Sequence, residues 1–112
     1  MDDAGSKING PLRVIVDYEL KDIVQFFMEC RRKEIPELRN ALQCKNFSVI
    51  ARIAHNIKGA GGGYGFDKIS DLGESIEDAA ASLNDSVVDN KLTELAHYLD
   101  QVEIIIGEPA SE

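Results

Sequence analysis

A histidine and a lysine precede a glycine-rich stretch in the segment HNIKGAGGGYGF, residues 55–66. His55 and Lys58 lie three positions apart, and five of the seven residues from Gly59 to Gly65 are glycine. A free imidazole is a competent nitrogen nucleophile near neutral pH. A cation one helical turn away could orient a phosphoryl group attached to such a nitrogen. The segment therefore suggests either a loop that cradles nucleotide phosphates or a histidine that carries a phosphoryl group itself.

The nucleotide-loop hypothesis fails on both motif and context. A dinucleotide fingerprint needs G-x-G-x-x-G after a strand, but the sixth position is Tyr64 counted from Gly59 and Phe66 counted from Gly61. A P-loop ends in Gly-Lys-Ser/Thr, whereas Lys58 precedes the glycines. The residues ahead of the glycines also show helical rather than strand periodicity.

A helix through this segment would present the histidine to solvent. With the apolar stripe taken as the core direction, His55 points roughly 140° away from the core. Lys58 lies on the same side of this helix, and Arg52 borders it. The neighbours of His55 one and two turns away have almost no side chain: Ala51, Gly59 and Gly62. The pattern predicts an imidazole that stands clear of the surface, near one or two cations.

The glycines leave two structural alternatives open. Each glycine inside a helix costs about 1 kcal/mol relative to alanine, so a helix that runs as far as Gly61 or Gly62 gives up stability for no structural return. The other possibility is that the helix stops at Gly59 and that residues 59–65 form a flexible connection.

Four amphipathic segments can position this histidine, and they predict an all-α, antiparallel up-down four-helix bundle. The first begins near Asp17 and has Ile23, Phe26 and Phe27 at helical spacing, with a slip at Pro36 that should kink the helix or start a new one. The core-facing residues expected of the other three segments follow. They are Ile50, Ile53, Ala54, Ile57 and Gly61 in the second, Ile69, Leu72, Ile76, Ala79 or Ala80, and Leu83 in the third, and Val88, Leu92, Leu95, Leu99, Val102 and Ile106 in the fourth.

The segments between and outside these helices complete the expected organisation. Asn46 is the expected N-cap of the second helix, and Ser86 with Asp89 resembles a capping box for the fourth. Residues 1–16 are expected to form a flexible or extended leader, in which residues 12–16 have strand composition but no evident partner strand. The bundle is expected over residues 17–107, followed by a tail at 108–112.

Composition narrows the partners and the location. The net charge of −8 and the pI near 4.7 oppose nonspecific binding to nucleic acid or to an anionic membrane. The sequence contains no membrane-spanning run and no signal peptide, so a cytoplasmic protein is expected. Cys30 and Cys44 form no metal-binding pattern, and a metal site or a disulfide framework is not expected.

The glycine-rich segment resembles the signature of a known protein family. His55, Lys58, Gly59 and Gly65, in the order His-x-x-Lys-Gly with a further glycine ten positions after the histidine, resemble the signature of histidine-containing phosphotransfer (HPt) domains. The similarity extends from about Asp17 to about Gly107.

The resemblance implies specific roles. His55 would accept the phosphoryl group, Lys58 would contact it, Gly59 would keep the space beside the imidazole open, and Gly65 would help the chain turn into the third helix. The partners would be response-regulator receiver domains or a hybrid histidine kinase, and the receiver domain would supply Mg²⁺. We expect a monomeric phosphocarrier with no cofactor and no kinase activity of its own.

Two other classes remain for comparison. A helical adaptor could bind a receiver domain without transferring phosphate, and Val24 and Met28, expected to face outward, would then be its contacts. The dimerising half of a histidine kinase would place its histidine in a two-helix hairpin, usually before an acidic residue, whereas Asn56 follows His55 here.

Overall fold

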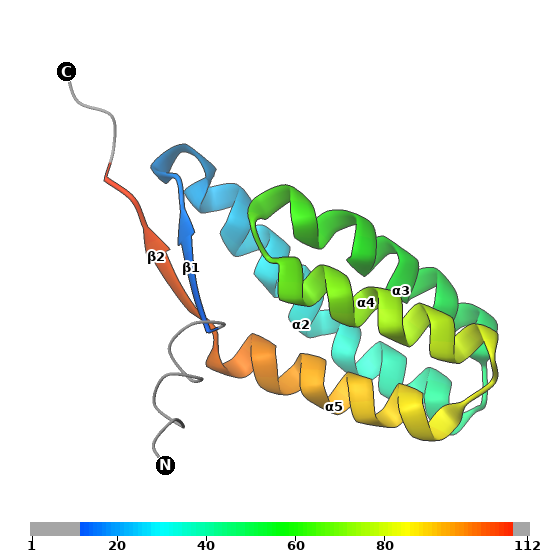
Figure 1. The fold of residues 1–112 in the computed structure, drawn as a ribbon. Coiled ribbons are helices and arrows are strands. Elements are labelled where there is room, and N and C mark those ends of the chain that lie inside the picture. Colours follow the sequence, from blue (N-terminus) through cyan, green and yellow to red (C-terminus); the bar gives the residue numbers. More distant parts are fainter. Residues whose placement is uncertain (1–11, 109–112) are drawn as a thin grey trace, which may run out of the picture.

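Four helices packed side by side form the main body of the chain in a computed structural model that describes residues 12–108 (Figure 1). The elements in chain order are β1 (Arg13–Val16), the short 3-10 helix η1 (Tyr18–Leu20), α2 (Lys21–Gln43), α3 (Phe47–Gly61), η2 (Gly62–Tyr64), α4 (Asp67–Ala81), α5 (Asp85–Gln101) and β2 (Glu103–Ile106). The predicted four-helix bundle is confirmed. The leader and tail expected at residues 1–11 and 109–112 lie outside the described residues.

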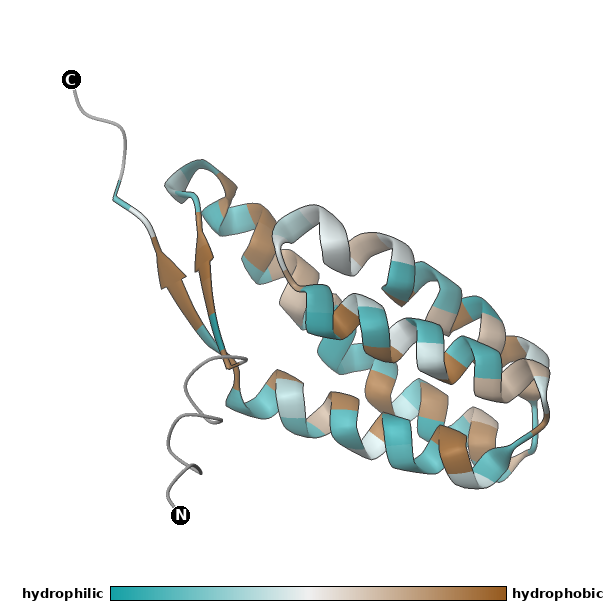
Figure 2. Cartoon of the chain, in the orientation of Figure 1, coloured by the Kyte–Doolittle hydropathy of each residue, from teal (hydrophilic) through white to brown (hydrophobic). Residues whose placement is uncertain are grey.

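The core of the bundle is apolar and receives side chains from all four helices. Figure 2 shows that the helices mix hydrophilic and hydrophobic segments, whereas both strands are mainly hydrophobic. The buried residues include most of those expected in the last three helices, among them Ile53, Ile57, Leu72, Ile76, Leu95 and Leu99. Burial of these faces is the main favourable contribution to folding.

The inward face predicted for the first helix was right only in part, since Phe27 is buried as expected. Val24 and Met28 are buried, whereas Ile23 and Phe26 are exposed. Once Val24 and Met28 set the phase, the stripe of three- and four-residue steps continues to Leu38 without a slip. The helix therefore does not restart at Pro36: α2 is one helix of 23 residues with this proline inside it.

The two ends of the described chain form a small parallel sheet that the sequence analysis missed. β1 pairs with β2 in parallel, with Val14 opposite Ile104 and Val16 opposite Ile106. The segment at residues 12–16 therefore has a partner strand, at the other end of the chain, and the whole bundle is the crossover connection. The fourth helix ends at Gln101 rather than continuing to Ile106, because Val102 is extended and the β-branched run that follows pairs with β1.

The helix caps were predicted in part. The side chain of Asn46 accepts a hydrogen bond from the backbone N–H of Val49, as expected of an N-cap. The cap of α5 is Asn84, which accepts from Val87, and the capping box expected at Ser86 is wrong because this residue lies inside the helix. Leu83 is exposed in the turn rather than buried at the end of α4.

Candidate functional site

The helix that carries His55 continues into the glycine-rich stretch. α3 includes Gly59 and ends at Gly61, and η2 begins at the next residue, Gly62. Gly65 then adopts a φ of 87°, in the left-handed region that favours glycine, and the backbone N–H of Phe66 bonds back to the carbonyl of Gly61. The alternative in which the helix stops at Gly59 is therefore wrong. The short helix η2 and the turn at Gly65 connect α3 to α4.

The imidazole of His55 is exposed but held at one nitrogen. Its side chain retains 68% of its accessible surface, and Nδ1 lies 3.0 Å from Oε2 of Glu77 on α4. The other oxygen of this carboxylate lies 3.9 Å from Nζ of Lys58. Glu77 thus bridges the two side chains that the sequence analysis had singled out.

The contact with Glu77 determines which ring nitrogen is free to react. A carboxylate accepts hydrogen bonds, so the bond at Nδ1 requires the proton to sit on that nitrogen. In the neutral imidazole the lone pair is then on Nε2, for which no protein partner occurs within residues 12–108. The site presents an oriented nitrogen nucleophile on the surface of a helix.

The surface beside this imidazole is open. A Cβ built at Gly59 or at Gly62 meets no heavy atom within 4 Å, and both residues are exposed. Ala51, one turn earlier, adds only a methyl group. An approaching protein could therefore reach Nε2 without displacing side chains at these positions.

The structure does not bring Arg52 into the cluster. This exposed residue lines a groove between α2 and α3 with Glu37 and Asn40, and the described residues provide no hydrogen bond or ion pair to its guanidinium. Of the two cations proposed from the sequence, Lys58 is the one that shares a partner with His55.

Glu77 was not predicted from the sequence as part of the site. Acidic residues are frequent along α4, and periodicity alone does not distinguish this one from Glu74 or Asp78, which are exposed. A usable signal was its spacing from two small residues, since Ser70, Gly73 and Glu77 follow each other at three- and four-residue steps on one helix face. This face packs against α3.

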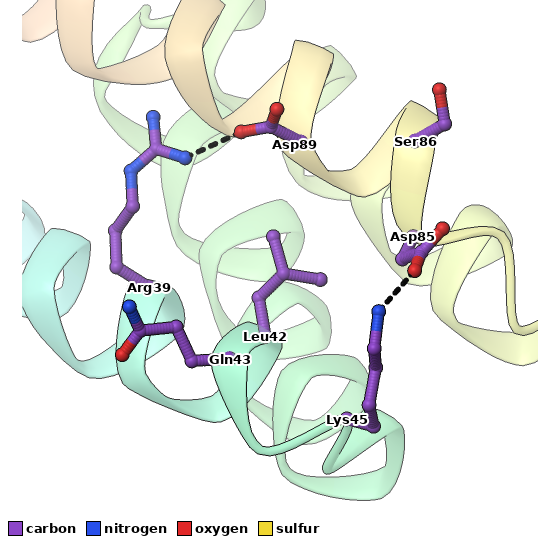
Figure 3. A pocket seen from close by; sticks show the side chains of 7 residues that line it. All are labelled: Arg39, Leu42, Gln43, Lys45, Asp85, Ser86 and Asp89. Atoms are coloured by element: carbon purple, nitrogen blue, oxygen red, sulfur yellow. Dashed lines mark hydrogen bonds and ion pairs between the residues drawn. The ribbon is translucent and has the colours of Figure 1, made fainter.

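A separate pocket of about 450 Å³ lies at the helix ends and shares no residue with the histidine site (Figure 3). Its walls come from the end of α2, the turn after it and the start of α5. Arg39 pairs with Asp89 at 2.6 Å, and Lys45 pairs with Asp85. The ammonium group of Lys45 lowers the pKa of the Asp85 carboxyl. The four charged side chains of this pocket are thus paired with one another.

Other kinds of site find no support in the described part of the chain. Residues 12–108 contain no cluster of three or more side chains that could hold a metal ion, and both cysteines are free thiols. None of the described helices is both long and apolar enough to cross a membrane.

Comparison with protein-family models identifies the class. Residues 22–104 match the Hpt domain, and the chain therefore belongs to this family. Hpt domains are histidine phosphotransfer modules of phosphorelays, they generally interact with receiver domains and kinases, and they typically have no kinase activity of their own. No curated protein and no solved structure matched the chain.

Proposed function

We propose that this chain is a phosphorelay intermediate that accepts a phosphoryl group on Nε2 of His55 from the aspartyl phosphate of a receiver domain and donates it to the aspartate of a receiver domain. The observation that supports this proposal best is that the imidazole of His55 is both exposed to solvent and held in a fixed orientation. Its imidazole is held at Nδ1 by Glu77 and is exposed, and the helix surface at Gly59 and Gly62 is open.

In the accepting step, the lone pair of Nε2 attacks the phosphorus atom of the aspartyl phosphate. The bond between phosphorus and the aspartate oxygen breaks, and its electron pair leaves with the carboxylate. The proton on Nδ1 stays in place, so the ring becomes a phosphorylated imidazolium whose positive charge faces the Glu77 carboxylate. Donation reverses these steps, and the electron pair of the P–N bond returns to Nε2.

The remaining residues act on the phosphoryl group or on access to it. Lys58 would release Glu77 and contact the phosphoryl oxygens, while Arg52, farther from the cluster, would add long-range positive charge. Gly59, Gly62 and Ala51 would leave room for the partner. The chain would need no metal of its own, because the receiver domain would supply Mg²⁺.

The structure buries the two residues that the adaptor alternative would use to bind a receiver domain. Val24 and Met28 are both at most 2% exposed and cannot form a docking surface without unfolding the core. An adaptor would also have no use for an imidazole oriented by a carboxylate. We therefore favour phosphotransfer.

The direct test is transfer of label from a phosphorylated receiver domain. We expect one acid-labile phosphoryl group per chain, absent in His55→Gln and retained in the matched variant His97→Gln, whose histidine is exposed on α5. ATP with Mg²⁺ and no partner should give no label. Label that persists in His55→Gln, or that appears from ATP alone, would contradict the proposal.

A further inference from the structure

One face of α4 contacts the turn of α3 that carries the candidate reactive residues. Ser70 Oγ donates a hydrogen bond of 2.7 Å to the carbonyl of Lys58. One turn farther, Gly73 lies against the backbone of Lys58 and Ala54. One more turn along, Glu77 reaches the side chains of His55 and Lys58. The backbone contacts and the functional contact thus follow each other on the same helix face.

The contact at Gly73 leaves no space for a side chain. A Cβ built there would lie 2.7 Å from the backbone nitrogen of Lys58 and 3.0 Å from the carbonyl oxygen of Ala54. Both atoms belong to the helix backbone and cannot rotate away. Any residue other than glycine would therefore have to separate α3 from α4 at this turn.

We propose that Gly73 is a positioning residue, which sets the helix separation at which Glu77 holds Nδ1 of His55. Glu77 is four residues farther along α4, so a displacement of the helix at Gly73 is carried to it. A hydrogen bond of 3.0 Å weakens steeply when its partners move apart. The consequence for phosphotransfer rests on the proposed function, whereas the effect on the orientation of the imidazole does not.

Gly61 provides a matched control for simple loss of packing. A Cβ on this residue would lie 2.8 Å from the backbone nitrogen of Ser70 and 3.0 Å from the carbonyl oxygen of Phe66. The steric conflict between α3 and α4 is of similar severity, but it lies at the end near the turn and not at the turn that precedes Glu77. Gly61→Ala and Gly73→Ala should therefore both lower the melting temperature, but only Gly73→Ala should change the orientation of the His55 imidazole.

The readout is the position of the proton on the imidazole, measured by long-range ¹H–¹⁵N NMR at alkaline pH. In the parent chain we expect His55 with its proton on Nδ1 and His97, which is exposed, with the mixture of tautomers of a free side chain. Gly73→Ala should move His55 toward the pattern of His97, and it should slow phosphoryl acceptance on the order of tenfold. Gly61→Ala should leave the His55 tautomer unchanged.

The proposal would be overturned if His55 kept the tautomer of the parent chain in Gly73→Ala, or if Gly61→Ala changed the His55 tautomer as much as Gly73→Ala does. If Gly73→Ala does not fold, Glu77→Asp decides, because it withdraws the carboxylate by one methylene without touching the helix contact. It should give the same shift of tautomer, and an unchanged tautomer would show that the separation is not critical. Failure of the parent chain to accept label would overturn the proposed function alone.

Discussion

The carboxylate of Glu77 lies 3.0 Å from Nδ1 of His55, and this contact joins α4 to α3 across 22 positions of sequence. It fixes the proton on one ring nitrogen and leaves the lone pair of the neutral ring on the other nitrogen, which is the proposed nucleophile. The same carboxylate lies 3.9 Å from the ammonium group of Lys58. In the chain without a phosphoryl group, Glu77 therefore pairs with the ammonium group of Lys58, which would contact the phosphoryl group after transfer.

Replacing Glu77 by glutamine should keep the orientation of the His55 ring but remove the negative charge beside it. Glutamine can still accept the Nδ1–H bond but does not stabilise a positive ring. A charge-assisted bond exceeds a neutral one by about 1 kcal/mol, so acceptance should slow about fivefold. Measure the transfer rate beside Glu74→Gln, an exposed change one turn earlier on α4, which should behave as the parent. Equal transfer rates in the parent chain, Glu77→Gln and Glu74→Gln would show that the charge of Glu77 does not contribute to transfer.

Lys58→Ala should slow phosphoryl transfer without abolishing it. The ammonium group contributes a charge-assisted contact worth about 1–3 kcal/mol, which corresponds to about 5- to 150-fold in rate. The matched variant is Lys68→Ala, which removes a cation paired with Glu94 on α5 rather than with the histidine cluster. Rapid-quench measurements with a phosphorylated receiver domain compare the two, and a similar small effect for both would show that Lys58 acts only through net charge.

Gly59→Gln or Gly62→Gln should impair transfer while leaving the helix intact or firmer. Their side chains would enter space that is empty now, beside the imidazole, and glutamine is a better helix former than glycine. Gly59→Ala is the control, because it raises helix stability by about 1 kcal/mol with only a methyl group added. Transfer rate and melting temperature are recorded together, and an unimpaired rate in the glutamine variants would disprove steric clearance.

Tyr98→Phe should change the stability of the chain at alkaline pH. Burial of Tyr98, and then the nearby charge of Asp67, raise the pKa of its phenol above 10.0. The unfolded chain therefore loses this proton first, and the free energy of unfolding falls as pH rises from 10.0 toward the folded pKa. Urea titrations between pH 8 and 11 should show a shallower decline for Tyr98→Phe, whereas parallel declines would contradict this assignment.

The sequence predicted the architecture because three of its four apolar stripes identify the buried face of their helix, apart from residues at the helix ends. In the first helix, two adjacent apolar positions at each turn allowed two phases, and the choice of Ile23 over Val24 put the wrong face inward. The true phase depends on which side of α2 packs against the other elements, where Val24 and Met28 join the common core. Such a contact between distant segments has no local signal.

The parallel sheet and Glu77 were missed for a related reason. A run such as Val102 to Ile106 satisfies helical steps and strand composition equally well, and the partner that decides between them lies 90 positions earlier at Arg13. His55 and Lys58 could be found because they share one helix, where spacing fixes their relation. Glu77 belongs to the next helix, and only the packing of α4 on α3 brings it to the imidazole.

The most direct test of the account is to determine which atom carries the phosphoryl group. The chain is phosphorylated by a phosphorylated receiver domain, and the attachment is assigned by ³¹P and ¹⁵N NMR of the intact product. The contact between Nδ1 and Glu77 predicts a single phosphoramidate at Nε2 of His55, with the proton still on Nδ1. A phosphoryl group on Nδ1 of His55, or on any other residue, would contradict it.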